Sequence, residues 1–287
     1  MNERLSPGLY IVATPIGNLG DLSPRAADVL ARADLVLAED RRVTAKLLAR
    51  TSSKAAMRNY NDHSSEGDRA EVVARLSEQA VALVSDAGTP LISDPGYKLV
   101  RDARSAGYPV VTLPGPCAAI AALTLAGLPT DRFLFLGFLP SKDKARADAI
   151  TEVAGLRASL VLYESGPRLG ATLRALVDGL GPREAAVARE LTKLHEECLT
   201  GSLVELAERF QDQPPKGEIV VVVGPPAAAA SPGADQLDSA LREALAHDSP
   251  SRAAALVAEQ LGLKRKPVYE RALVLSRASN GVDPGQR

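Results

Sequence analysis

A short apolar run, Val81 to Val84, leads directly into a loop of small, acidic and proline residues, Ser85 to Gly96, which reads SDAGTPLISDPG. Consecutive apolar residues bounded by turn-forming residues are typical of a buried strand. Open α/β sheets bind their ligands at the carboxyl ends of such strands. Gly88 permits positive φ and close approach of a ligand, and Pro90 stiffens a loop that would otherwise lose entropy on ordering. We therefore predict an α/β sheet whose loop at 85–96 holds a ligand.

The common phosphate-binding motifs are missing from this chain. No G-x-G-x-x-G follows a predicted strand, and no G-x-x-x-x-G-K-[ST] occurs. Both motifs bind phosphates at a helix N-terminus, so dinucleotides and nucleoside triphosphates are disfavoured as ligands. A ligand without phosphates that is recognised by carbonyls, amides and carboxylates suits the loop, and S-adenosylmethionine is the commonest such cofactor. Acidic walls would stabilise its positively charged sulfonium.

Composition and charge narrow the class of protein. The 287 residues are 46% hydrophobic and 24% charged, which predicts a globular chain of two domains. The formal net charge of −1 argues against a uniformly basic nucleic-acid surface but leaves room for local basic patches. Two cysteines form no disulfide framework, and neither a signal peptide nor an apolar stretch of about 18 residues is recognisable. We expect a cytoplasmic protein with no membrane span and, because the three histidines lack ligand spacing, no metal.

Apolar runs alternate with helix-like segments in the order of a mostly parallel α/β sheet. The predicted strands are 9–13, 35–38, 81–84 and 110–113, and then 133–138, 159–163, 185–189 and 219–223. The predicted helices are near 23–32, 43–50, 66–79, 96–106 and 117–126, and then 144–154, 168–179 and 203–210. This pattern predicts an N-terminal α/β domain over 1–127, a second α/β domain over 128–224, a Pro-, Ala- and Gly-rich linker over 225–234, and a helical tail over 235–287.

The tail has the pattern of a helix-turn-helix. Leucines recur at every fourth position on one helical face, and Ser251 is a candidate N-cap for the next helix. A turn at Gly262 separates that helix from a segment opened by Lys264, Arg265 and Lys266. The basic start of the last helix predicts contact with nucleic acid. A small helical bundle with a solvated charge run is the alternative.

Eight ordered motifs resemble the ribosomal RNA small subunit methyltransferase I family, the RNA branch of the tetrapyrrole methylase superfamily. The motifs are LYIVATPIGNL at 9–19, AEDRR at 38–42, SDAGTPLISDPG at 85–96, LPGPCA at 113–118, GFLP at 137–140, YES at 163–165, RELTK at 189–193 and KGE at 216–218. The resemblance is strong over residues 8–224 and looser in the tail.

The resemblance implies two α/β domains of the tetrapyrrole methylase type, S-adenosylmethionine in the cleft between them, a small C-terminal helical domain and a homodimer. It also implies 2′-O-methylation of a cytidine ribose in 16S ribosomal RNA of the small ribosomal subunit. Two motifs depart from the family pattern. AEDTRxT is AEDRRVT at 38–44, and YESxHR is YESGPR at 163–168, so one Thr and one His are lost whereas Arg42, Thr44 and Arg168 match.

Methyl transfer to a ribose hydroxyl needs collinear positioning and a group that accepts the hydroxyl proton. A carboxylate or a neutral lysine suits that role. The candidate catalytic residues, all in matching motifs, are Glu39, Asp40, Arg42, Glu190 and Lys193. Each has an alternative as a surface ion pair or a helix cap.

The same motifs supply the candidate binding residues. Those for the cofactor are Pro15, Asp86, Gly88, Pro90, Leu91, Ile92, Cys117, Ala118, Tyr163, Glu164, Thr192, Gly217 and Glu218. Those for substrate RNA are Asn61, His63, Lys142, Lys144, Arg168, Lys264, Arg265 and Lys266. A capping turn explains Asn61 equally well, a solvated helix face explains Lys142 and Lys144, and Cys117 is interpreted as a small residue beside the cofactor.

Two other functions stay open on the sequence. A precorrin-type methylase acting on a tetrapyrrole has no use for a basic helix-turn-helix. A ribosome-assembly factor that only binds RNA has no use for a cofactor loop. The sequence favours the ribosomal RNA methyltransferase over both.

Overall fold

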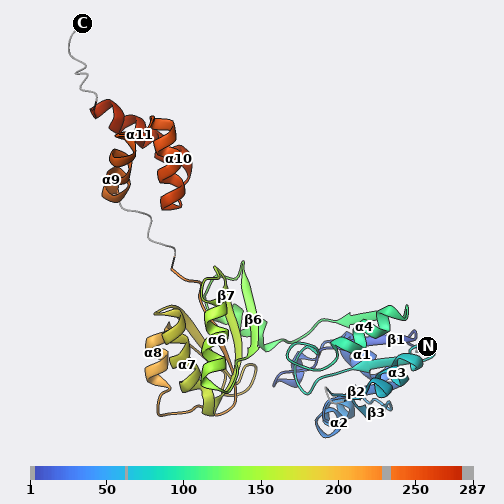
Figure 1. Cartoon of the computed structure of the whole chain (residues 1–287). Helices are drawn as coiled ribbons and strands as arrows, with labels where there is room; N and C mark the ends of the chain where they lie inside the picture. The colour runs from blue at the N-terminus through green and yellow to red at the C-terminus, as the bar shows by residue number, and fades with distance from the viewer. Residues whose placement is uncertain (1–3, 62–63, 228–233, 280–287) are drawn as a thin grey trace. The chain divides into compact units, whose positions relative to one another are not determined.

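The protein is described here from a computed structural model that defines residues 4–61, 64–227 and 234–279. Its contacts divide the chain into two compact units, Met1–Pro226 and Ala227–Arg287 (Figure 1). Each unit is described by itself. The predicted linker lies largely outside the described residues.

The first sheet is fully parallel, with strand order β3-β2-β4-β1-β5. Its strands are β1 (Gly8–Val12), β2 (Leu35–Ala38), β3 (Ala56–Asn59), β4 (Ala80–Leu83) and β5 (Val110–Leu113). Helices α1 (Pro24–Arg32) and α2 (Arg41–Arg50) pack on one face, and α3 (Glu66–Arg75) and α4 (Tyr97–Ser105) pack on the other. The central strands β1, β2 and β4 are therefore buried on both faces, which explains their uninterrupted apolar sequences.

The chain directions diverge between the adjacent strands β2 and β4. From β2 the chain continues through α2 to β3 on one side, and from β4 it continues through α4 to β5 on the other. Open α/β sheets bind ligands at such a switch point, outside the carboxyl ends of the strands. The segments that begin at Glu39 and at Val84 leave the sheet there.

The second sheet is mixed, with strand order β6-β7-β10-β8-β9. Its strands are β6 (Phe133–Phe138), β7 (Ser159–Ser165), β8 (Glu184–Arg189), β9 (Glu197–Ser202) and β10 (Glu218–Val223). Only β6 and β7 pair in parallel, and the other neighbours are antiparallel. Helices α6 (Asp143–Val153), α7 (Gly166–Leu180) and α8 (Leu203–Arg209) cover one face (Figure 1). Helix α5 (Ala118–Leu125), which precedes this sheet in the chain, packs on the other face.

The predicted fold class, two α/β sheets followed by a C-terminal helical domain, is confirmed. Two strands, β3 and β9, were not among the predicted strands. Both are edge strands, so each has a partner on one side only and tolerates polar residues such as Arg58 and Thr200. The second sheet is also less parallel than the βα alternation predicts, because β8, β9 and β10 return alongside one another without a helical crossover between β8 and β9.

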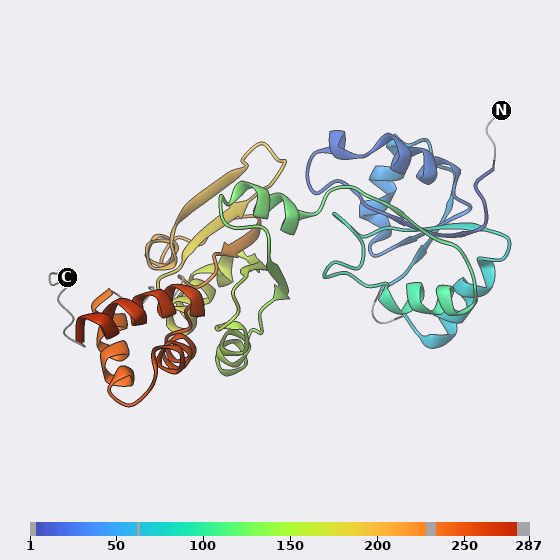
Figure 2. The same cartoon turned by 90° about the horizontal axis from the view of Figure 1, so that it is seen from above.

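The C-terminal unit is a three-helix bundle of α9 (Ala234–Leu245), α10 (Pro250–Leu261) and α11 (Arg265–Ser279) (Figure 2). Leu241, Val257 and Val268 meet in its core. Gly262 ends α10 in a left-handed conformation, as expected for the turn of a helix-turn-helix. The N-cap of α10 is Ser249 and not the predicted Ser251, because Pro250 already occupies the first turn.

Among the described residues, no helix combines the length and apolar character needed to cross a membrane.

Candidate active site

A cavity of about 340 Å³ lies in the N-terminal unit. It is enclosed by the loops that follow β1 and β4, the start of α5, and the ends of β6, β7 and β10. Its lining residues are Ile16, Ala87, Gly88, Thr89, Ile92, Ser93, Asp94, Ala118, Phe138, Tyr163, Glu164, Ser165, Leu191, Gly217, Glu218, Ile219 and Val220. The wall is largely apolar with a few polar groups, and its size falls in the range of roughly 300 to 1,000 Å³ that is usual for small-molecule sites.

The 85–96 loop is held in place by backbone pairing. The amide of Thr14 donates to the carbonyl of Gly88 at 2.8 Å, and the amide of Gly88 donates back at 3.1 Å. The hydroxyl of Thr89 donates to the carbonyl of Pro116 at 2.9 Å. Leu91 and Ser93 adopt positive φ, which is uncommon for non-glycine residues. Strained backbone of this kind clusters at functional sites, so it supports a ligand role for the loop.

A second strained turn, at 190–193, contacts the loop that follows β1. Glu190 and Thr192 have positive φ, like Leu91 and Ser93 in the first loop. The side-chain oxygen of Thr192 accepts a hydrogen bond of 3.0 Å from the amide of Asn18. The turn therefore joins the RELTK and TPIGN motifs across the boundary between the two sheets.

Lys193 is held between two carboxylates at this turn. Its Nζ lies 3.0 Å from Oε1 of Glu190 and 3.1 Å from Oε2 of Glu218. Burial disfavours the ammonium, but the hydrogen bonds to both acids outweigh that effect and raise the pKa of Lys193. The hydrogen bond from Lys193 also lowers the pKa of Glu190. Gly217 has positive φ, which favours glycine, and a Cβ there would displace the Glu190 carboxylate from its place beside Lys193.

Tyr163 forms an aromatic wall with two phenylalanines. Its ring stacks edge-on with Phe135 at 4.9 Å and with Phe138 at 5.6 Å between ring centroids. The amide of Ala119 donates to the Tyr163 hydroxyl at 3.3 Å, which links β7 to the start of α5. Burial, followed by the neighbouring Cys117, raises the pKa of Tyr163, so this hydroxyl stays neutral.

The side chain of Glu164 points away from solvent and is fully enclosed. It accepts hydrogen bonds from Thr172 Oγ1 at 2.6 Å and from the Ser165 amide at 2.8 Å, and it lies 3.3 Å from Nε of Arg168. Arg168 also donates to the carbonyl of Leu139 at 2.6 Å. This network fixes the end of β7 against α7, so it positions the backbone of the YES motif in the cavity wall.

An open groove lies beside the cavity, at the carboxyl ends of β2 and β3. It is lined by Glu39, Asp40, Arg41, Arg42, Ala45, Met57, Arg58 and Asn59. Asp40 caps α2 and pairs with Arg42 at 2.6 Å; the hydrogen bonds from Arg42 lower the pKa of Asp40 to about 2. Oδ1 of Asp86 accepts the amide hydrogen of Asp40 at 2.9 Å. The carboxylate of Asp86 therefore holds the turn at Asp40 in place at the switch point of the sheet.

The structure brings part of the predicted cofactor set together. Gly88, Ile92, Ala118, Tyr163, Glu164, Gly217 and Glu218 line the cavity. Pro15, Asp86, Pro90, Leu91, Cys117 and Thr192 do not, although each adjoins a lining residue or contacts a motif turn. Of the candidate catalytic residues, Glu39, Asp40 and Arg42 lie in the groove, whereas Glu190 and Lys193 lie at the turn beside Glu218.

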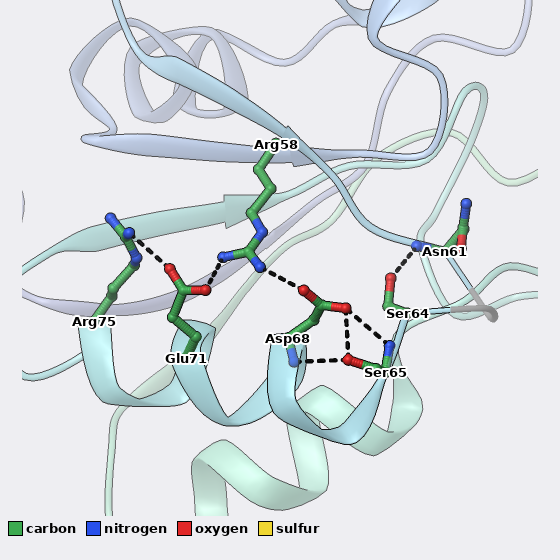
Figure 3. Close-up of polar contacts among 7 residues, drawn as sticks. All are labelled: Arg58, Asn61, Ser64, Ser65, Asp68, Glu71 and Arg75. Carbon is green, nitrogen blue, oxygen red and sulfur yellow. Dashed lines mark hydrogen bonds and ion pairs between the residues drawn. The ribbon is translucent and has the colours of Figure 1, made fainter.

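The predicted RNA residues are dispersed. Asn61 does not line the cavity. Its backbone amide donates to Ser64 Oγ at 3.0 Å, beside the α3 capping box of Ser65 and Asp68 (Figure 3). His63 lies outside the described residues. Lys142 is the exposed N-cap of α6, and Lys144 pairs with Asp148. In the C-terminal unit, Arg265 and Lys266 open α11, and Lys264 directly precedes it.

Several lining residues were not predicted. Ile219 and Val220 directly follow the KGE motif, and the others, Ile16, Ala87, Thr89, Ser93, Asp94, Phe138, Ser165 and Leu191, belong to the eight motifs. Their presence in the motifs was the available signal, but which side chains face the cavity depends on contacts between the two sheets. Within the described parts of the chain, no three His, Cys, Asp or Glu side chains gather closely enough to hold a metal ion.

Two family models match the chain. Tetrapyrrole (Corrin/Porphyrin) Methylases match residues 8–207, and the RsmI C-terminal HTH domain matches residues 231–276. Uroporphyrin-III-C-methyltransferase from Thermus thermophilus has a similar structure, with a TM-score of 0.55 and 22% identity over 76% of this chain and 94% of that one. A second structure of that enzyme, complexed with S-adenyl homocysteine, aligns with a TM-score of 0.52 and 22% identity over 75% of this chain and 96% of that one. These likenesses concern the fold.

Sequence relatives are more specific. Ribosomal RNA small subunit methyltransferase I of Erythrobacter litoralis is 58% identical over 95% of this chain and 97% of its own length. The protein of the same name from Mesorhizobium japonicum is 45% identical over 98% of this chain and 96% of its own. The chain therefore belongs to the ribosomal RNA small subunit methyltransferase I family of the tetrapyrrole methylases.

Proposed function

We propose that this chain is an S-adenosylmethionine-dependent ribosomal RNA methyltransferase that methylates the 2′-oxygen of a cytidine ribose in 16S ribosomal RNA. The observation that carries the proposal is the cavity itself. Its walls come from seven of the eight family motifs, in a chain 58% identical to a relative named for this activity. The substrate is the small ribosomal subunit or its RNA.

The cavity fits S-adenosylmethionine. Apolar and aromatic groups such as Ile92 and Tyr163 suit an adenine ring, and the close backbone at Gly88 and Gly217 suits its polar edges. Asp94 and Glu218 add carboxylates to the wall, which favours a cation. When bound, the cofactor supplies an electrophilic methyl group on a sulfonium.

The four candidates for the proton acceptor differ in charge state. An ammonium cannot accept a proton, and the two carboxylates keep Lys193 in that form. A carboxylate with a pKa of about 2, as in Asp40, is a weak base. Glu190 is bound to Lys193. We therefore assign an electrostatic role to Lys193, and Glu39, in the groove beside the switch point, stays a candidate proton acceptor together with Asp40 and Glu190.

The remaining assignments concern partners and location. We propose that the chain forms a homodimer, acts in the cytoplasm and requires no metal. The exposed apolar side chains Ile120 and Leu125 on α5 favour self-association. Sedimentation velocity of the purified protein tests the dimer.

A tetrapyrrole substrate is the alternative that the fold neighbours bring to mind. The helix-turn-helix unit argues against it, because basic residues at the start of α11 suit an RNA backbone and not a carboxylated macrocycle bound in a cavity. Incubating the protein with S-adenosylmethionine and either small subunits or uroporphyrinogen III separates the two. Methyl transfer to RNA supports the proposal, and transfer to the macrocycle alone overturns it.

Calorimetry tests the cofactor assignment. We expect S-adenosylmethionine to bind the purified chain equally well with and without a chelator. Binding that needs a divalent ion, or no binding at all, contradicts it.

A further inference from the structure

Helix α2 has an unusual charge pattern. Its sequence, RRVTAKLLAR, holds four cations and no acid. Within the described parts of the chain it is the one helix that has cations without an acidic residue. Arg41, Lys46 and Arg50 are exposed, and Lys54 continues the exposed series beyond the helix. We call Arg41, Lys46, Arg50 and Lys54 the α2 stripe.

The cations of the α2 stripe have no ion-pair partner among the described residues. Cations nearby are matched. Arg58 on the adjacent strand β3 binds Asp68 at 2.8 Å and Glu71 at 3.0 Å (Figure 3), and Arg32 on α1 pairs with Asp28 one turn away. The stripe therefore differs from the cations of the adjacent strand β3 and of helix α1, which are neutralised by nearby acids.

The charge pattern does not serve the stability of α2. Lys46 and Arg50 are spaced i, i+4, where like charges repel. Arg41, in the first turn, also faces the positive end of the helix dipole, and Arg50 alone, in the last turn, is favoured by it. Leu47 and Leu48 anchor the helix to the sheet from the opposite side. Repulsion maintained on a solvent face points to an anionic partner.

The position of the stripe selects the partner. Arg41 lines the groove at the switch point, next to Glu39 and Asp40, and Lys46 and Arg50 follow from that groove along the helix. At 1.5 Å rise per residue, the helix carries its cations over roughly 15 Å. Cations spread over the exposed side of a helix that starts at a candidate reaction site suit a chain of phosphates.

We propose that the α2 stripe binds the RNA backbone beside the nucleotide that is methylated. This inference rests on the proposed function and deepens it, because it adds an RNA surface in the N-terminal unit that is separate from the basic helix-turn-helix. The α2 stripe sets the register of the RNA strand and does not read base identity.

The test uses the full-length protein with two charges removed from the stripe, Lys46→Gln together with Arg50→Gln. The matched control is Arg174→Gln together with Arg209→Gln, two exposed residues of α7 and α8 that also lack an ion pair among the described residues. Affinity for assembled small subunits and for naked 16S RNA is measured across a salt titration. S-adenosylmethionine affinity and the thermal midpoint are measured in parallel.

We expect the stripe variant to lose about 0.7 to 0.9 of the salt slope per phosphate contact removed, with cofactor affinity unchanged. Its thermal midpoint should stay the same or rise, since repulsion is relieved, whereas a structural role would lower it. A slope equal to that of the control overturns the inference. Loss of binding to subunits with full binding to naked RNA also overturns it, because the stripe would then contact an acidic protein.

Measurements on the wild-type protein distinguish a failure of the proposed function from a failure of this inference alone. If it neither binds nor methylates small-subunit RNA, the proposed function fails and the inference fails with it. If it does both and the stripe variant matches the control, only the inference is wrong.

Discussion

The side-chain oxygen of Thr192 and the backbone amide of Asn18 form a 3.0 Å hydrogen bond between residues 174 positions apart. Asn18 follows the first strand of the first sheet, and Thr192 follows β8 of the second. Thr192 also has positive φ, and its own amide donates to Glu196 at 2.6 Å. The contact fixes the relative position of two turns next to the cavity, one of which supplies Ile16 and the other Leu191 to its lining.

Thr192→Val removes this hydrogen bond and keeps the shape of the side chain. We expect weaker S-adenosylmethionine binding, by a factor of about 2 to 10, because a net hydrogen bond contributes about 0.5 to 1.5 kcal/mol. Thr192→Ser keeps the hydroxyl and is the control. If calorimetry gives the two variants equal affinities for S-adenosylmethionine, the hydrogen bond between Thr192 and Asn18 does not contribute to cofactor binding.

Lys193→Met tests the role of the cation between Glu190 and Glu218. In the wild type the pKa of Glu190 lies below the unfolded value, so its stabilising effect is present above about pH 4.3 and is lost as pH falls through the folded pKa. The raised pKa of Lys193 stabilises the fold below about pH 10.4 and stops doing so as pH rises through the folded value. In the Lys193→Met variant, the free energy of unfolding should therefore depend less on pH in both the acidic and the alkaline range.

Denaturant unfolding of Lys193→Met at several pH values checks this expectation. Lys193→Arg retains a cation and serves as the control. The methionine variant should also transfer methyl groups more slowly, and its rate should not recover at high pH. A wild-type rate of methyl transfer that rises as pH passes the pKa of Lys193, with no such rise in the methionine variant, would instead identify Lys193 as a base that must lose its proton.

Thr172→Val leaves the enclosed carboxylate of Glu164 without its 2.6 Å hydroxyl partner. We expect a loss of about 1 to 3 kcal/mol in the free energy of unfolding, since a buried polar group is left unsatisfied. Thr172→Ser should restore most of it. A valine variant with wild-type stability in urea denaturation would show that the Glu164 network does not fix β7 against α7.

Asp86→Ala removes the acceptor for the Asp40 amide, a contact at the switch point and not in the cavity wall. We expect the rate of methyl transfer to fall while the S-adenosylmethionine dissociation constant changes by less than about tenfold, or 1.4 kcal/mol. Asp86→Asn keeps an acceptor oxygen and should retain more of the rate. A larger loss of cofactor affinity in calorimetry would place Asp86 among the cofactor ligands.

The sequence predicted the two α/β sheets, because buried central strands such as β1 and β4 must be apolar on both faces. It did not predict β3 or β9, since an edge strand needs no such pattern. Nor could periodicity reveal that α5 packs on the second sheet. Its residues Ala119, Ala122 and Leu123 suit any apolar surface, and only the assembled fold selects the one they contact.

The candidate site shows the same division. The motif loops were predicted, and seven of the predicted cofactor residues line the cavity: Gly88, Ile92, Ala118, Tyr163, Glu164, Gly217 and Glu218. The direction of individual side chains was not predictable. Asp86 has the chemistry of a ligand for a cation, but its carboxylate binds the amide of Asp40, 46 residues away in the chain. Likewise, the side chains of Glu164 and Arg168 pair with each other, and Arg168 also donates to the backbone carbonyl of Leu139.

The most direct test of the account is mass mapping of ribose methylation in 16S RNA. Small subunits that lack the modification are incubated with the purified protein and S-adenosylmethionine, and the RNA is then digested and analysed. We expect one new methyl group on the 2′-oxygen of a cytidine, formed without added metal and faster on assembled subunits than on short oligonucleotides. A methyl group on a base, or no transfer from a protein that binds S-adenosylmethionine, would contradict the proposed function.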